Sequence, residues 1–161
     1  MELRKMMEET AARHGLPARL VEAVVKVESG GDPWAFRYEP RFYERYVLND
    51  ASLRAAPPCS LATERQARAS SWGLMQVMGA TARGLGFSGP FLAQLCEPSA
   101  GLEYGCRLLA LLRDRHLPSL GWPGVVAAYN AGSPRRDESG RYVNQPYVEK
   151  IAKALQGEWP R

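Results

Sequence analysis

Residues 17–31, PARLVEAVVKVESGG, carry the strongest helical pattern in this chain of 161 residues. The apolar side chains of this segment recur every three or four residues: Leu20, Val21, Val24, Val25 and Val27. This spacing predicts a largely buried amphipathic helix. Pro17 suits the first turn of a helix, and the pair Gly30 and Gly31 ends it.

Glu28 lies on the apolar face of this predicted helix, because it follows Val21, Val24 and Val25 at helical spacing. No lysine or arginine on that face neutralises it. Burial of an unpaired carboxyl raises its pKa, so Glu28 is expected to be a proton donor near neutral pH. The alternative is that Glu28 is only the last-turn residue of the helix, where it reaches solvent or caps a neighbouring loop.

Apolar residues at helical spacing predict further helices over about 3–14, 79–85, 90–95, 98–116, 122–129 and 147–155. Prolines and aromatic residues interrupt the pattern between Asp32 and Ser70, so this part is expected to be irregular with one or two short helices. No linker, low-complexity run or internal repeat divides the chain. The sequence therefore predicts one mainly α-helical domain over residues 1–161, with little or no β structure.

The charge and cysteine content exclude several classes of protein. The chain has 21 basic and 17 acidic side chains and a formal net charge of +4, which weakly favours an acidic partner. It lacks the dense basic charge of a dedicated nucleic-acid binder. Three cysteines and two histidines at unrelated spacings do not form a metal-ligand set, although a Cys96–Cys106 disulfide stays open. We expect no metal, no cofactor and no nucleic acid as partner.

The beginning of the chain does not resemble a secretory signal, because charged side chains are spread over residues 1–9. The longest uncharged stretch, residues 117–134, contains prolines and glycines and cannot form an uninterrupted membrane-spanning helix. We therefore expect a protein that is made in the cytoplasm and has no stable membrane association. A chain from which a signal had already been removed would read the same, which leaves the compartment open.

Three short blocks stand out: VESGGDP at residues 27–33, SWGLMQ at 71–76 and AAYNAG at 127–132. In this order and at this separation they resemble the motif blocks of the lytic transglycosylases, which are related to goose-type lysozymes. Any one block is weakly specific, whereas three in register are strongly specific. The resemblance covers about residues 16–155 and implies a lysozyme-like fold with a substrate groove.

The resemblance implies a role for individual residues. Glu28 matches the catalytic acid, which protonates the glycosidic oxygen between N-acetylmuramic acid and N-acetylglucosamine in peptidoglycan. The other matching positions are implied to bind or orient the glycan: Ser29, Met75, Gln76, Tyr129, Asn130 and Tyr147. Ser29 is expected to orient the carboxyl or a substrate group. The hydroxyl of Tyr129 is expected near the catalytic carboxyl, and Tyr147 is expected to close the cleft from the last helix.

The resemblance also implies a mechanism in which Glu28 is first the acid and then the base, while the sugar's own 6-hydroxyl forms a 1,6-anhydromuramic acid end. A carboxyl against valines suits this role, because oxocarbenium-like cleavage needs an acid that is protonated at working pH. An inverting, goose-type muramidase is the alternative, with Glu39 activating water. A surface salt bridge of Glu39 with Arg37 or Arg41 is equally open. Weaker candidates are three other acids: Asp32, Asp50 and Glu64.

Residues 37–46 interleave arginines with aromatic side chains, as single-stranded nucleic-acid binders also do. Tyr38, Phe42 and Tyr46 are spaced four residues apart, so we expect them to share a helical face that packs into the domain. Trp72 is expected to be structural. The charged loop 135–141 is either a solvated connection or a mobile rim of the groove whose arginines attract wall carboxylates.

A peptidoglycan-cleaving enzyme is thus the first hypothesis, and a non-catalytic cell-wall-binding module is a lower one. The expected partner is the glycan strand, bound by a monomer. Because residues 1–9 do not resemble a secretory signal, we favour a phage or prophage lysis protein that is released through a holin. A virion-associated enzyme and a bacterial enzyme whose signal was removed fit nearly as well. The expected site of action is the cell wall.

Overall fold

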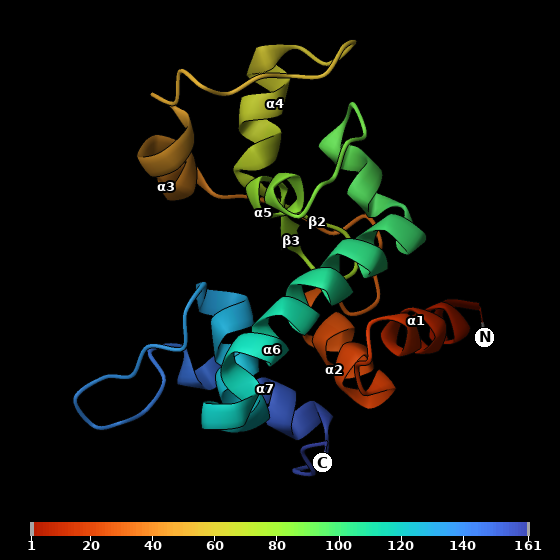
Figure 1. The fold of residues 1–161 in the computed structure, drawn as a ribbon, viewed down its shortest axis with the longest axis vertical. Coiled ribbons are helices and arrows are strands. Elements are labelled where there is room, and N and C mark those ends of the chain that lie inside the picture. The colour runs from red at the N-terminus through yellow and green to blue at the C-terminus, as the bar shows by residue number, and fades with distance from the viewer. Residues whose placement is uncertain (1, 161) are drawn as a thin grey trace. The chain divides into compact units, whose positions relative to one another are not determined.

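The computed structural model describes residues 2–160 and is mainly helical, with one small sheet (Figure 1). The elements in chain order are α1 (Glu2–Arg13), α2 (Ala18–Glu28), β1 (Phe36–Tyr38), α3 (Pro40–Phe42), the π-helical turn η1 (Tyr43–Val47), α4 (Leu61–Arg68), β2 (Ser70–Trp72), β3 (Val77–Met78), α5 (Gly79–Gly84), the 3-10 helix η2 (Leu92–Cys96), α6 (Pro98–Ala131) and α7 (Gln145–Ala154). This confirms the predicted fold class.

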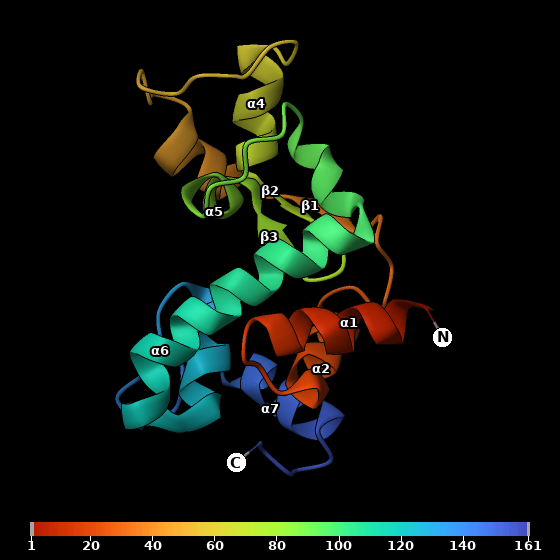
Figure 2. The same ribbon diagram turned by 45° about the vertical axis from the view of Figure 1, so that its right-hand side comes forward.

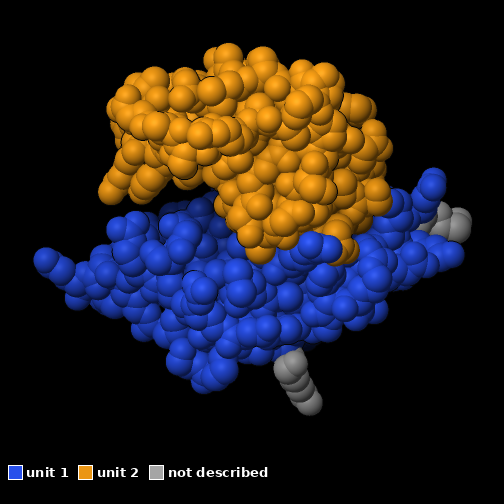
Figure 3. All heavy atoms as spheres, turned by 45° about the horizontal axis from the view of Figure 1, so that its top comes forward, with its two compact units in different colours: residues 1–27, 106–161 blue, residues 28–105 orange. Residues whose placement is uncertain are grey.

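The chain divides into two compact units (Figure 3). Unit 1 combines Met1–Val27 with Cys106–Arg161, and unit 2 is the continuous segment Glu28–Gly105. Helix α6 starts in unit 2 and continues into unit 1. That residues 1–161 act as one domain stays a prediction.

Unit 1 consists of the amphipathic helices that the apolar periodicity predicts. Helices α1 and α2 lie side by side (Figures 1 and 2), joined at Gly15, whose φ of 61° favours glycine. The guanidinium of Arg113 on α6 donates to the carbonyls of His14 and Gly15 at 2.9 and 2.7 Å. Helix α6 breaks at Gly121, which has a φ of 63°. The buried residues of α2 are Leu20, Val21, Ala23, Val24 and Val25.

Unit 2 contains a three-stranded antiparallel sheet in the order β1-β2-β3. Phe36 pairs with Trp72 and Tyr38 pairs with Ser70 across β1 and β2, while Trp72 pairs with Val77 on β3. The short helix α4 contacts β2, η1 and α5. The sequence pattern did not predict β1, because three residues are too few to show a strand period.

Glycines let the start of α6 approach its neighbours closely within unit 2. Gly101 and Gly105 are one turn apart on α6. A Cβ on Gly101 would lie 2.7 Å from the carbonyl oxygen of Leu95, and a Cβ on Gly105 would lie 2.6 Å from the Cβ of Met75. Gly73 also faces the Leu95 carbonyl and has a φ of 68°. The segment around residues 73–75 therefore packs against α6 and η2 at distances that exclude larger residues.

A buried carboxylate joins α4 to α5. The side chain of Glu64 is 1% exposed and accepts hydrogen bonds from Nε of Arg68 at 2.8 Å and from Nε and Nη2 of Arg83, each at 2.8 Å. Nη1 of Arg83 donates to the carbonyls of Phe87 and Gly89 at 2.8 and 2.7 Å. Burial opposes ionisation of Glu64, but the hydrogen bonds and charges of Arg83 and Arg68 outweigh it and lower its pKa.

One expectation from the sequence is wrong, and one open alternative is decided. Tyr38, Phe42 and Tyr46 do not share a helical face, because Tyr38 lies on β1; Tyr38 and Tyr46 are exposed, and only Phe42 packs against buried residues. All three cysteines are buried and none of them forms a disulfide within residues 2–160, so the Cys96–Cys106 bridge that the sequence left open is absent and the thiols stay separate. Burial raises the pKa of the Cys96 thiol.

Replacing Gly105 by alanine is expected to lower the free energy of unfolding by about 1–3 kcal/mol, because the added methyl group overlaps Met75. The matched control is Gly84→Ala on α5, where a Cβ meets nothing within 4 Å. That control is expected to be neutral or to stabilise by up to about 1 kcal/mol. Urea unfolding of both variants measures the difference; equal effects would contradict the close packing at Gly105.

The Glu64 cluster is expected to make stability depend on acid pH. Because the pKa of Glu64 lies below its ordinary value of 4.5, the unfolded chain takes up this proton first; the stabilisation is complete above pH 4.5 and declines as the pH falls below it. Glu64→Gln is expected to cost about 3–5 kcal/mol at pH 7, since it removes a buried carboxylate that pairs with two half-buried arginines. Thermal unfolding at pH 7 and pH 3.5 tests this, with the exposed Glu44→Gln as control; a Glu64→Gln variant as stable as this control would contradict it.

Candidate active site

Glu28 is the last residue of α2 and is half-buried. Both sequence interpretations therefore apply in part, since the carboxyl follows the buried valines and also ends the helix. Gly30 and Gly31, with φ angles of 65° and 89°, turn the chain away immediately afterwards. The role of Glu28 as a proton donor stays a prediction.

Ser29 connects the end of α2 to the second motif block within unit 2. Its hydroxyl donates to the carbonyl oxygen of Leu74 at 2.8 Å and accepts from the amide of Gly31 at 3.2 Å. The residue after the candidate acid is therefore fixed to the SWGLMQ segment. This bond brings two of the three blocks together, and a role of Ser29 toward substrate stays a prediction.

The side-chain amide of Gln76 fixes the backbone of the SWGLMQ segment. Gln76 has a φ of 47°, and its Nε2 donates to the carbonyls of Ala35 and Gly73 at 2.9 and 3.0 Å. The amide of Gly73 donates to Ala35 at 2.8 Å. Met75 is fully buried against Gly105. Both side chains shape the segment in this structure, and their contact with sugar stays a prediction.

Glu39 lies between β1 and α3 and forms the ion pair that the sequence left open. Its Oε1 is 2.6 Å from Nε of Arg37, and the side chain of Glu39 is 32% exposed. The backbone amide of Glu39 donates to the carbonyl of Ala69 at 2.8 Å. Its role in activating water stays a prediction.

The three weaker acid candidates are engaged in local structure. The carboxylate of Asp32 accepts from the amide of Trp34 at 2.8 Å, as in an Asx turn. Asp50 accepts from the amide and the hydroxyl of Ser52, and these hydrogen bonds lower the pKa of Asp50. Glu64 belongs to the buried cluster described above.

The third motif block lies in unit 1, at the end of α6. Asn130 is exposed, and its Oδ1 accepts from Nδ2 of Asn144 at 2.9 Å. Nδ2 of Asn144 also donates to the carbonyl of Ala127 at 3.0 Å. Asn144 therefore ties this block to the start of α7, which carries the half-buried Tyr147. Sequence reasoning missed Asn144; its only signal is an Asn just before the Gln-Pro that opens the last helix.

The loop that follows the third block forms a narrow hairpin. Arg136 pairs with Tyr142, and its guanidinium lies 4.8 Å from the Tyr142 ring centre. Asp137 accepts from the amide and hydroxyl of Ser139 and from the amide of Arg141; the Ser139 hydroxyl contributes most to its lowered pKa. The loop is thus organised by its own side chains.

Neither a membrane span nor a metal cluster occurs in the part of the chain that the structure describes. No helix within residues 2–160 combines the length and apolarity needed to cross a bilayer. In the same range, histidine, cysteine, aspartate and glutamate side chains do not gather in groups of three that could bind a metal ion.

Comparison with curated proteins gives relatives of two kinds. The endolysin of Enterobacteria phage PRD1 is 39% identical over 67 residues, which cover 37% of this chain and 45% of the endolysin. The membrane-bound lytic murein transglycosylase C of Actinobacillus pleuropneumoniae serotype 5b (strain L20) is 28% identical over 139 residues, which cover 80% of this chain and 30% of that protein. The chain thus spans less than half the length of either relative.

No solved structure gives a significant match to the chain. The model of the Transglycosylase SLT domain family, in contrast, matches residues 5–151. This range includes all three motif blocks, all of unit 2 and most of unit 1. The resemblance inferred from the blocks is therefore confirmed, and the chain belongs to the Transglycosylase SLT domain family.

Proposed function

We propose that this protein cleaves the β-1,4 bond between N-acetylmuramic acid and N-acetylglucosamine in peptidoglycan, as a lytic transglycosylase. The observation that carries the proposal is the placement of Glu28 at the end of α2, joined through Ser29 to Leu74 of the second motif block. Family membership and the names of the relatives support it.

In the proposed reaction, Glu28 donates its proton to the glycosidic oxygen, and the bond from that oxygen to C1 of the muramyl residue breaks. The developing positive charge spreads over C1 and the ring oxygen. The 6-hydroxyl oxygen of the same sugar then attacks C1, and its proton passes to the Glu28 carboxylate. The products are a 1,6-anhydromuramic acid end and a free 4-hydroxyl, with no water consumed and Glu28 protonated again.

The proposed setting is the bacterial cell wall. A relative named endolysin supports action during phage lysis, and a relative named membrane-bound lytic murein transglycosylase supports action in a bacterial envelope. We favour the first, with a monomer that reaches the wall after release through a holin. Adding the purified protein to cells with intact or permeabilised membranes separates this from a protein that crosses the membrane unaided.

Glu28→Gln is expected to abolish clearing of peptidoglycan, because the amide keeps the shape of the side chain but cannot donate the proton. A general acid contributes roughly 10²–10⁴-fold to the rate. Clearing is measured by zymography and by turbidity, with circular dichroism to show that the variant is folded. Retained clearing by Glu28→Gln would exclude this residue as the acid, and a wild type that binds the wall without clearing it would favour the non-catalytic module.

The mass of the released muropeptides separates the two enzyme mechanisms. A transglycosylase leaves 1,6-anhydro ends, which are one water lighter than the reducing ends of a muramidase. We expect anhydro ends from the wild type, and unchanged products from Glu39→Gln. Reducing ends that disappear in Glu39→Gln would instead establish the inverting muramidase with Glu39 as the base.

A further inference from the structure

The small sheet in unit 2 has one aromatic face. Because side chains alternate along a strand, Phe36 and Tyr38 on β1 share a face with their partners Trp72 and Ser70 on β2. The rings of Phe36 and Trp72 are 4.8 Å apart at an interplanar angle of 55°. Phe36 is 56% exposed, so this aromatic pair is open to solvent.

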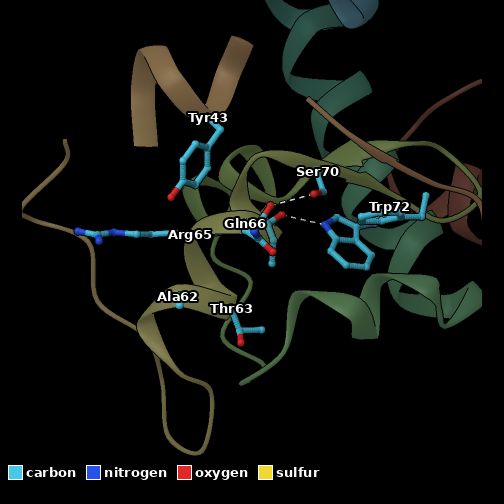
Figure 4. A pocket seen from close by; sticks show the side chains of 9 residues that line it. Tyr43, Ala62, Thr63, Arg65, Gln66, Ser70 and Trp72 are labelled. Atoms are coloured by element: carbon cyan, nitrogen blue, oxygen red, sulfur yellow. Dashed lines mark hydrogen bonds between the residues drawn. The ribbon is translucent and has the colours of Figure 1, made fainter. Parts of the chain in front are cut away.

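A pocket of about 400 Å³ lies against this face, with α4 as its floor and Tyr43 of η1 opposite Trp72 (Figure 4). Its volume is within the range of small-molecule sites, about 300–1,000 Å³. The lining includes Phe36, Tyr43, Thr63, Gln66, Ser70 and Trp72. None of the residues that the motif blocks assign to the reaction lines it.

Several polar groups of this pocket already form hydrogen bonds within the protein. The indole Nε1 of Trp72 donates to the carbonyl of Ala67 at 2.9 Å, and the Ser70 hydroxyl donates to the carbonyl of Gln66 at 2.8 Å. These bonds fix the Trp72 ring as a rigid wall. The hydroxyl of Tyr43 and the carboxamide of Gln66, in contrast, hydrogen-bond to no residue within 2–160. They are the groups available to a ligand.

Arg65 adds positive charge at the edge of the pocket. Its guanidinium extends away from Trp72 (Figure 4), and its buried Nε has no hydrogen-bond partner in the described chain. Asp50 is close enough for Arg65 and Arg68 to act on it electrostatically. We therefore assign Arg65 no direct contact with a ligand.

We propose that this pocket is a second saccharide site that holds an N-acetylated hexosamine of the glycan strand. The apolar face of a pyranose ring suits the Trp72 and Phe36 rings, and its acetamido group suits the Tyr43 hydroxyl and the Gln66 carboxamide. The tilt between the rings leaves no parallel-walled slot for a flat nucleobase. The identity of the sugar rests on the proposed function, since peptidoglycan supplies N-acetylated sugars at high density.

The test measures binding in the Glu28→Gln background, so that it does not depend on cleavage. The probe is the soluble β-1,4-linked tetramer of N-acetylglucosamine, and the readout is the indole NMR signal of Trp72, assigned with Trp72→Phe. We expect this signal to shift on titration. Tyr43→Phe and Gln66→Ala are each expected to weaken the affinity seen at this signal by roughly threefold to tenfold, the effect of one hydrogen bond.

Three further measurements make the result specific. Tyr46→Phe changes an exposed tyrosine on the same turn outside the pocket and is expected to leave the affinity unchanged. The glucose tetramer of the same linkage lacks the acetamido group and is expected to bind at least tenfold more weakly. Ala62→Phe, which fills the pocket from an exposed position on α4, is expected to abolish the shift.

A Trp72 signal that stays unmoved by saturating probe would overturn the second site, and so would equal affinity for the two tetramers. Neither result bears on cleavage, which zymography of the wild type decides separately. Conversely, a wild type that fails to clear peptidoglycan while the Trp72 signal shifts would overturn the proposed function and keep the second site.

Discussion

The close approach of the 73–75 segment to the first two turns of α6 is the constraint on which unit 2 depends. Gly101 and Gly105 have no room for a Cβ beside Leu95 and Met75, and Gly73 faces the same Leu95 carbonyl. Packing this tight fixes the segment against α6 and against the Leu95 carbonyl of η2. Ser29 then bonds to Leu74 in that fixed segment, so the position of the residue after Glu28 follows from glycines that carry no chemistry.

A second, electrostatic constraint within unit 2 holds α4 to α5. Glu64 joins α4 to α5 through Arg68 and Arg83, and Arg83 continues to the carbonyls after α5. The two constraints differ in kind, because the glycine contacts are insensitive to pH whereas the carboxylate cluster weakens in acid. Trp72 on β2 is joined to α4 by the hydrogen bond from its indole to the carbonyl of Ala67.

The sequence predicted the helices that are long enough to show an apolar periodicity. Apolar periodicity located α1, α2, α6 and α7, and glycines marked their ends at Gly15 and Gly30. It could not reveal β1, a three-residue strand formed through pairing with β2, and it misplaced Tyr38 on a helix for that reason. Glu64 was only a weaker candidate for a catalytic acid, and its buried cluster could not be read from the sequence because its partner Arg83 is 19 residues away. The motif blocks supplied the candidate site residues, but not Asn144, which acts through contacts that only the fold creates.

The division of the chain has a consequence for the order in which it acquires structure during synthesis. Unit 2 is one continuous segment, so every residue it needs has been polymerised once Gly105 is in place. Unit 1 combines the first 27 residues with the segment from Cys106 onward, and Arg19 on α2 bonds to the carbonyl of Leu155, 136 positions later. The helix that ends in the candidate acid is therefore made early but obtains its full set of neighbours only when α7 has been translated.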